Sequence, residues 1–350
     1  GKAALEGFAD VEGTEIIVFY PSEGVSDIQK RQMITQMGKN VKVFGIEGNF
    51  DDAQRGVKEI FGNAELAAEL EEKGYAFSSA NSINWGRLVP QIVYYFSAYV
   101  DAVKAKSIKM GDPVNFVVPT GNFGNILAGY YAKLMGLPVD RLLCASNSNN
   151  VLTDFINTGV YDKRRDFYKT VSPSMDILVS SNLERLLYSI TGENAEKVAA
   201  MMDKLNNEGS YKVEADSLKI IQSEFFGAWV DEVETKGVIA KVYSDYNYLM
   251  DTHTAVAWGA LEKYRFLTSD ETFTIVLSTA SPYKFCDSVL EALEDAKQEN
   301  VEPFDLLRKL NEKTKAPIPE RMLALETLPI IHSDVIEAAD MEKAVVEYLK

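Results

Sequence analysis

The sequence contains little cysteine and little histidine, with two residues of each among 350. Cys144 and Cys286 both lie inside apolar stretches, where buried free thiols are the expected state. No group of histidine, cysteine and carboxylate residues has the spacing of metal ligands. The sequence therefore indicates neither a disulfide framework nor a zinc site.

Long apolar runs and basic stripes are also missing. No run approaches the length of a membrane span, and residues 1–10 lack the charged-then-apolar order of a signal peptide. The formal net charge of −16 is spread along the chain, which argues against nucleic acid or an anionic membrane as a partner. We therefore expect a cytoplasmic globular protein, and 350 residues with 46% apolar content are enough for two lobes.

Strand patterns alternate with helix patterns, which predicts an α/β fold with a parallel sheet. The predicted strands are 15–20, 41–46, 114–119, 141–145, 172–182 and 272–278. Residues 193–242 are charged and helical in pattern without strand signals, which indicates a helical insertion. Beyond Lys284 the pattern is again helical, with a proline-containing connector at Ala316–Pro319.

The stretch Val114–Asn125 carries the strongest signal for a binding site. Its apolar run ends at Pro119, turns through Gly121 and Gly124, and leads into a helical pattern over Ile126–Met135. Such a turn directs several backbone N–H groups at one point, which makes an anion site. The turn matches neither the dinucleotide fingerprint nor the P-loop, so a small phosphate-bearing cofactor fits better. The alternative is a strand-to-helix turn that holds no ligand.

A second polar segment, Ser78–Arg87, precedes a predicted long helix that reaches Lys104. Amide, hydroxyl and guanidinium groups gather at the start of this helix, a combination that can hold a phosphate dianion. These residues are Asn81, Ser82, Asn84 and Arg87. The alternative is a polar capping loop with a solvated arginine.

Polar side chains also follow two other predicted strands, at Ser146–Asn150 and Ser278–Ser281. Because ligand clefts of parallel sheets lie at the carboxyl ends of strands, we expect the first segment to line the cleft of the glycine turn and a hydroxyl of the second to meet a ligand. The alternatives are an Asx-rich helix cap and a simple Ser/Thr turn. His253, at the start of a predicted helix, is a candidate acid or base, or else a satisfied helix-start histidine.

Seven segments follow one another in the order and at the spacing found in a known family, and together they span most of residues 1–285. They are Gly1–Leu5, Asn81–Arg87, Pro119–Asn125, Ser172–Ile177, Ser181–Arg185, Asp251–Val256 and Ser278–Ala280. Together they resemble threonine synthase, a pyridoxal-phosphate enzyme of the tryptophan-synthase-β-like fold. The resemblance implies a two-lobed α/β protein of fold type II with parallel-sheet cores. Residues 1–106 would be the remainder of the first lobe, and residues 107–350 the cofactor-binding lobe with a helical insertion around 193–247.

The resemblance also implies roles for the polar segments. The phosphate of pyridoxal 5'-phosphate would lie in the glycine turn, and Ser278 or Thr279 would face its pyridine nitrogen. The phosphate of a substrate, O-phospho-L-homoserine, would be held by the second segment, and the implied products are L-threonine and phosphate. The implied cofactor residues are Gly121, Asn122, Phe123, Gly124, Asn125, Ser278 and Thr279, and the implied substrate residues are Asn81, Ser82, Asn84 and Arg87.

Two positions depart from the family pattern. The Schiff-base lysine of the family lies upstream of the turn whose last glycine matches Gly1, and Lys2 is not that residue because it falls one position after the glycine. Ser281 stands where the family pattern has histidine. We therefore expect an N-terminally truncated threonine synthase that is inactive alone, and the sequence leaves its oligomeric state open.

Two other functions stay open at this point. A threonine or serine dehydratase of the same fold would share the cofactor turn but would not need the phosphate site at Asn81–Arg87. A non-catalytic module would keep a cleft for phosphate ligands without chemistry.

Overall fold

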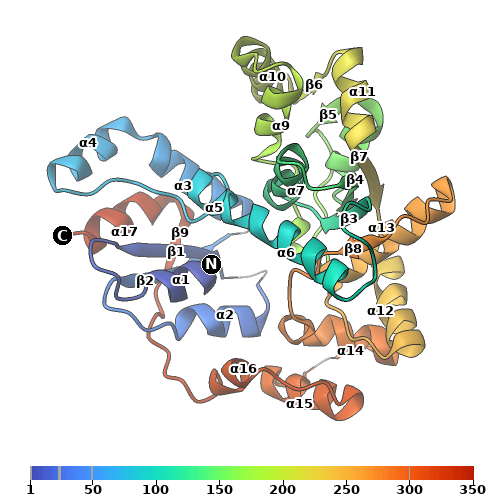
Figure 1. Cartoon of the computed structure of the whole chain (residues 1–350). Coiled ribbons are helices and arrows are strands. Elements are labelled where there is room, and N and C mark those ends of the chain that lie inside the picture. The colour runs from blue at the N-terminus through green and yellow to red at the C-terminus, as the bar shows by residue number, and fades with distance from the viewer. Residues whose placement is uncertain (1, 23–24, 49, 299) are drawn as a thin grey trace. The chain divides into compact units, whose positions relative to one another are not determined.

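The computed structural model describes residues 2–22, 25–48, 50–298 and 300–350, which form two compact units (Figure 1). Unit 1 joins Gly1–Ala80 with Asn300–Lys350, and unit 2 is Asn81–Glu299. Each unit has its own parallel sheet, so the predicted α/β class is confirmed. The predicted lobes, 1–106 and 107–350, stay a prediction. Among the described residues, no helix has both the length and the apolar content that a membrane crossing needs.

Unit 1 is a three-stranded parallel sheet in the order β1-β2-β9 with helices on both faces. Its strands are β1 (Ile16–Pro21), β2 (Val41–Glu47) and β9 (Val335–Glu337). Its helices are α1 (Lys2–Phe8), α2 (Asp27–Ile34), α3 (Phe50–Gly62), α4 (Ala64–Glu72), α15 (Pro303–Thr314), α16 (Glu320–Ala324) and α17 (Met341–Tyr348). Successive side chains of β2 point to opposite faces of the sheet, so both faces are covered by apolar packing. Val41 and Val43 pack with Leu5 of α1 on one face, and Ile46 packs with Met341 of α17 on the other.

Unit 2 is built on a four-stranded parallel sheet in the order β7-β4-β3-β8. Its strands are β3 (Val114–Pro119), β4 (Val139–Ser146), β7 (Phe225–Trp229) and β8 (Thr274–Val276), and β5 (Val160–Asp162) with β6 (Ser210–Lys212) form a separate antiparallel ribbon. Its helices are α5 (Trp85–Leu88), α6 (Pro90–Lys104), α7 (Gly124–Leu134), α8 (Val151–Thr158), α9 (Leu183–Ile190), α10 (Ala195–Glu208), α11 (Ala215–Glu224), α12 (Glu232–Tyr246), α13 (Thr252–Thr268) and α14 (Cys286–Glu294).

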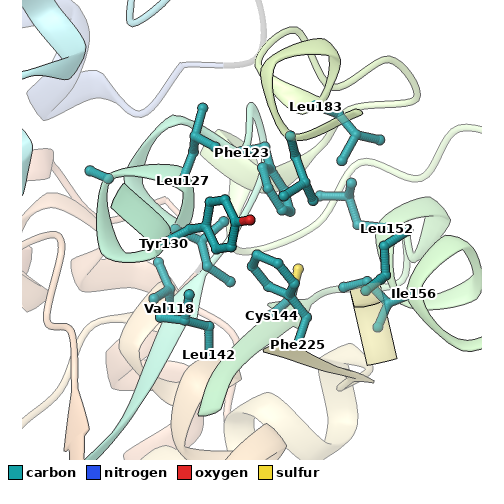
Figure 2. Close-up of a cluster of buried hydrophobic side chains, with 14 of the residues drawn as sticks. Val118, Phe123, Leu127, Tyr130, Leu142, Cys144, Leu152, Ile156, Leu183 and Phe225 are labelled. Atoms are coloured by element: carbon teal, nitrogen blue, oxygen red, sulfur yellow. The ribbon is translucent and has the colours of Figure 1, made fainter. Parts of the chain in front are cut away.

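β3 is buried on both faces, as its apolar run predicts. On one face Val118 packs with side chains of α7, α8, α9 and β7 in a cluster that includes Leu127, Ile156 and Phe225 (Figure 2). On the other face Val117 packs with Val256 and other residues of α13. The central strand is therefore held by helices on both sides, and its carboxyl end cannot shift without disturbing two cores.

Both cysteines are free and buried, as predicted. Burial raises the pKa of Cys144 and of Cys286 to about 12, so both thiols stay protonated and unreactive at neutral pH.

Three expectations about secondary structure are wrong. Residues 193–242 are not helical throughout, because β6 and β7 interrupt them and β7 pairs with β4 in the main sheet. The predicted strand at 172–182 is a short 3-10 turn, Pro173–Met175, since prolines and hydroxyl residues form turns there. The tail beyond Lys284 is not only helical, because β9 pairs with β2 in unit 1.

The packing of α7 generates a stability prediction. A Cβ on Gly129 would lie 2.7 Å from Cε1 of Tyr95, whose ring is buried, whereas a Cβ on Gly237 in α12 would have no described atom within 4 Å. We expect Gly129→Ala to lower the free energy of unfolding by about 1–3 kcal/mol through overpacking. The matched control Gly237→Ala should raise it by up to about 1 kcal/mol. Denaturant unfolding checks both, and equal effects from the two variants would contradict the close contact.

Candidate functional site

The carboxyl end of β3 leads directly into an uncapped helix N-terminus. Phe123, the N-cap residue before Gly124, adopts the left-handed conformation with φ of 61°, and its side chain makes no capping hydrogen bond to α7. The first N–H groups of a helix have no partners within it, and a left-handed residue before them turns further N–H groups toward the same point. Because its ring is 1% exposed and lies 5.7 Å from the ring of Phe225, Phe123 anchors the turn in the core (Figure 2). The turn therefore has the geometry of an anion site.

Both glycines of the turn lie against other chain segments. A Cβ on Gly124 would lie 2.5 Å from Oγ of Ser82, and a Cβ on Gly121 would lie 2.7 Å from the carbonyl oxygen of Ser174. Either contact is too close for a real side chain. The glycines are therefore required by close packing as well as by the turn.

The turn lies at the point where the order of the strands in the sheet reverses. From β3 the chain passes through α7 to β4 on one side, and the later strand β8 pairs with β3 on the other side. In open parallel sheets the ligand crevice forms at such a switch point, outside the carboxyl ends of the strands. A cavity of about 470 Å³ is present there. Its lining is Tyr94, Tyr95, Ala98, Phe116, Asn125, Ile275, Val276, Leu277, Ser278 and Thr279.

Two tyrosines of α6 hold Asn125 at the edge of this cavity. The hydroxyl of Tyr94 donates to Oδ1 of Asn125 at 2.7 Å, and the hydroxyl of Tyr95 donates to Oδ1 and to the carbonyl oxygen at 2.8 Å each. Burial raises the pKa of Tyr94 and of Tyr95, so both hydroxyls remain donors at neutral pH. With its carboxamide oxygen engaged, Asn125 can direct its NH₂ group elsewhere.

The predicted substrate segment is tied to the turn by α9. The side-chain NH₂ of Asn182 donates to Oγ of Ser82 and to the carbonyl oxygen of Asn122, each at 2.9 Å. The guanidinium of Arg185 donates to the carbonyl oxygens of Ser82 and Ile83 and to Oδ1 of Asn182. The structure thus brings Ser82 beside Gly124 and fixes the loop by its backbone.

The other members of that segment serve different purposes. Oδ1 of Asn81 accepts from the N–H of Ile83 at 3.1 Å, and Oδ1 of Asn84 caps α5 by accepting from the N–H of Gly86 at 2.9 Å. These are the capping bonds of the alternative interpretation. Arg87 is exposed, and no hydrogen bond or ion pair of its guanidinium occurs within the described part of the chain.

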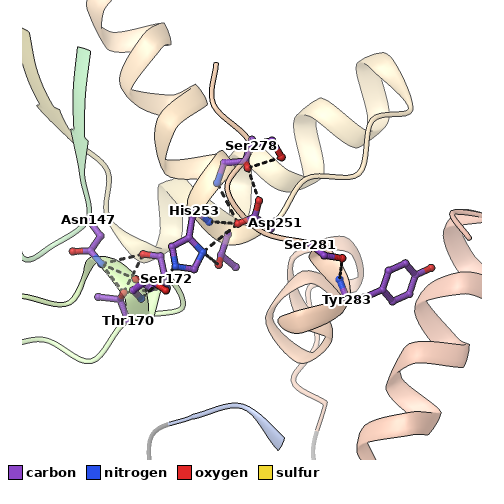
Figure 3. A network of polar contacts seen from close by, with 11 residues as sticks. Asn147, Thr170, Ser172, Asp251, His253, Ser278, Ser281 and Tyr283 are labelled. Carbon is purple, nitrogen blue, oxygen red and sulfur yellow. Dashed lines mark hydrogen bonds and ion pairs between the residues drawn. The ribbon is translucent and has the colours of Figure 1, made fainter. Parts of the chain in front are cut away.

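A buried polar network lies next to the site (Figure 3). Asp251 caps α13 and accepts from the N–H of His253 at 2.9 Å and from the hydroxyl of Thr254, and that hydroxyl lies 3.2 Å from Oγ of Ser278. Burial acts to raise the pKa of Asp251, but bonds from His253 and Thr254 outweigh it and lower the pKa below its ordinary value. The cap is therefore an ionised carboxylate. It fixes the hydroxyl of Thr254, which in turn contacts Ser278 in the cavity lining.

The expectation that Ser146–Asn150 lines the cleft is wrong for its buried asparagines. Asn147 is 2% exposed, and its NH₂ donates to Oγ of Ser172 at 3.0 Å and to Oδ1 of Asp176 at 2.7 Å. Asn149 donates to the same carboxylate at 3.0 Å. Despite these bonds, burial dominates and raises the pKa of Asp176. The segment folds inward because its amides satisfy a carboxylate that water cannot reach.

Sequence reasoning missed four residues of this site. Asn182 and Arg185 belong to a segment that carried the family resemblance, which was a usable signal for their importance. Tyr94 and Tyr95 had none, because their spacing along α6 is that of an ordinary apolar helix face.

Comparisons with known proteins identify relatives of this chain and of its fold. A family model described as the C-terminal part of threonine synthase matches residues 254–346. Human threonine synthase-like 1 is 37% identical over 98% of this chain and 45% of its own length. A pyridoxal-phosphate-bound threonine synthase from Brucella melitensis superposes with a TM-score of 0.82, at 36% identity over 99% of this chain and 67% of that chain. Yeast threonine synthase gives a TM-score of 0.83, at 33% identity over 100% and 67%.

The fold is that of a pyridoxal-phosphate-dependent enzyme of fold type II. The resemblance seen in the sequence is confirmed, and the chain belongs to the threonine synthase family. It spans about half the length of the human relative and two thirds of each solved chain.

The contact between Gly124 and Ser82 generates a second prediction. Gly124→Ala should lower the free energy of unfolding by about 1–3 kcal/mol, because the new methyl group displaces Ser82 and its bond to Asn182. Adding Ser82→Gly removes the atoms that clash and should recover at least half of the loss, as a double-mutant cycle in denaturant would show. If the double variant is no more stable than Gly124→Ala, the clash is not the cause.

A third prediction follows from the lowered pKa of Asp251. A carboxyl group whose pKa is lower in the folded state stabilises the fold above its unfolded pKa of 3.8, and this contribution is lost as the pH falls through the folded value. Asp251→Asn keeps an oxygen for the helix cap but cannot be ionised. We expect its deficit in unfolding free energy to be largest near about pH 6 and to shrink below about pH 4. A deficit that stays constant over this range would contradict the assignment.

Proposed function

We propose that the glycine turn of unit 2 holds the phosphate of pyridoxal 5'-phosphate. The observation that carries this proposal is the uncapped N-terminus of α7 behind a buried left-handed residue, Phe123, at the switch point of the sheet. A phosphate dianion would satisfy the N–H groups over residues 121–125 and would gain from the helix dipole. Glycine at positions 121 and 124 leaves no side chain in the way.

The cavity beside the turn fits the ring of this cofactor. Asn125, held by Tyr94 and Tyr95, lines the cavity and would lie near the phosphate of the cofactor. Ser278 and Thr279 lie in the lining that follows β8. When bound, the cofactor would supply an electron sink for carbanions formed at carbon atoms of an amino acid. A hydroxyl of Ser278 or Thr279 facing the pyridine nitrogen leaves the ring less electron-withdrawing than a carboxylate would, which suits elimination and replacement.

Residues Asn81–Arg87 are proposed to bind the phosphate of the substrate. Ser82 already lies beside the turn, and the backbone of its loop is fixed by Arg185. Arg87 is the exposed cation of the segment, and its guanidinium can form a bidentate pair with a phosphate. Because the protein carries a net charge of −16, such local donors are needed to attract an anionic substrate.

The reaction we propose for the whole protein is that of threonine synthase: O-phospho-L-homoserine and water give L-threonine and phosphate. The same donors that bind the substrate phosphate would stabilise it as it leaves. A dehydratase of the same fold remains the second candidate only through the shared cofactor turn.

The test is inorganic phosphate release from O-phospho-L-homoserine with pyridoxal phosphate present, for Gly1–Lys350 and for the complete gene product. We expect release from the complete product.

Arg87→Ala should raise the KM of the complete product about tenfold to a hundredfold by removing a charged phosphate contact. The matched control is Arg321→Ala, since Arg321 is 91% exposed. A KM unchanged by Arg87→Ala would favour the dehydratase, and no release from either protein would overturn the proposed reaction.

A further inference from the structure

His253 is buried next to the site and takes no part in the function proposed above. Its ring is 3% exposed in the first turn of α13, and it lies 5.0 Å from the ring of Phe285. A helix cap needs only the carboxylate of Asp251, so a fully buried imidazole beside that cap requires its own explanation.

The two ring nitrogens of His253 have partners of opposite kind, of which Figure 3 labels Asp251. Nδ1 lies 3.1 Å from Oδ1 of Asp251, which can only accept a hydrogen bond. Nε2 accepts from the backbone N–H of Ser174 at 3.3 Å, and that group can only donate. The imidazole that satisfies both partners is neutral, with its proton on Nδ1. Either other protonation state would place two N–H groups against each other at Ser174.

Ser174 also lies against the glycine turn. Its carbonyl oxygen lies 2.7 Å from the position that a Cβ on Gly121 would occupy. Around the same turn, the hydroxyl of Ser180 donates to the carbonyl oxygen of Gly121 at 2.8 Å. The backbone at Ser174 therefore lies between the imidazole and the first residue of the turn, and a shift of one moves the other.

The same carboxylate reaches a second part of the site. Through the hydroxyl of Thr254 it connects to Ser278 in the cavity lining. Asp251 is therefore linked by hydrogen bonds to two parts of the site. His253 connects it to Ser174 beside Gly121, and Thr254 connects it to Ser278 after β8.

We propose that His253 is a positioning residue: as a neutral imidazole with its proton on Nδ1, it transmits the position of the Asp251 carboxylate to Ser174 and thereby places Gly121 for phosphate binding. The inference rests on the proposed function, because it takes the ligand of the turn to be the phosphate of the cofactor. A purely structural histidine would support the fold equally for ligands with and without a phosphate.

The tautomer can be tested without any ligand. The chain has only two histidines, and Nε2 of the other one, His332 in unit 1, lies 2.9 Å from the carbonyl oxygen of Gln36, so that nitrogen carries a proton. Long-range nitrogen–proton correlation spectra of ¹⁵N-histidine-labelled protein should show His253 protonated on Nδ1 alone and His332 protonated on Nε2. His332→Leu assigns the two signals. A proton on Nε2 of His253 would overturn the proposal.

The positioning role is tested by comparing pyridoxal 5'-phosphate with pyridoxal, which lacks the phosphate. We expect His253→Leu to weaken binding of the phosphate form about five- to tenfold, as loss of one hydrogen bond predicts, and binding of pyridoxal less than about twofold. His253→Gln retains a donor and an acceptor and should bind both within about twofold of the parent protein. His332→Leu, the matched control, should leave the affinity ratio of the two ligands unchanged.

Exchange of the Ser174 amide hydrogen gives a readout that needs no cofactor. It should become about fivefold faster in His253→Leu and stay unchanged in His332→Leu. An equal loss of affinity for both ligands, or an unchanged exchange rate, would overturn the positioning role. If the parent protein binds neither ligand, the proposed function fails, while the tautomer and the exchange rate still decide whether His253 holds Ser174.

Discussion

The close approach between the start of α7 and the backbone around it is the constraint on which unit 2 depends. Gly124 has no room for a side chain beside Ser82, and Gly121 has none beside Ser174. The turn can be so crowded because β3 is buried on both faces and holds its carboxyl end still. Its one large side chain, Phe123, goes into the core in a strained left-handed conformation instead of toward the cleft.

This arrangement explains how a protein with a net charge of −16 can offer an anion site. The attraction comes from backbone N–H groups and a helix dipole, which act over a short range and in a partly buried turn. Arg185 uses its guanidinium on backbone carbonyl oxygens and on Asn182, which itself donates to the turn at Asn122. It shapes the loop, and the exposed cation of that loop is Arg87.

Elements with a strong local pattern could be predicted from the sequence. The strand predicted at 114–119 has the observed bounds of β3, and the strand predicted at 41–46 differs from β2 by one residue. β7 was missed because Phe225–Trp229 is a short apolar run between helices, and its strand state comes from pairing with β4. β9 was missed because its three residues pair with a strand almost 300 positions earlier, which no local pattern records.

The site shows the same division between local and distant information. Glycine, asparagine and hydroxyl residues of the turn and of Asn81–Arg87 are visible as motifs, because turn chemistry is local. Which of them meet was not visible: Asn182 joins Ser82 to Asn122 across 100 and 60 positions. The buried amides at Asn147 and Asn149 could not be distinguished from cleft-lining ones, because the difference lies in the carboxylate of Asp176 that they satisfy.

The return of the chain's last segment to unit 1 has a consequence for how the protein is made. Unit 2 is continuous in sequence, whereas the sheet of unit 1 needs β9 from residues 335–337. During synthesis the ribosome therefore releases every residue of unit 2 before it releases the third strand of unit 1. Until then the carboxyl end of β2 is an open edge, and a nascent chain stalled before residue 335 exposes a strand that can pair with other chains.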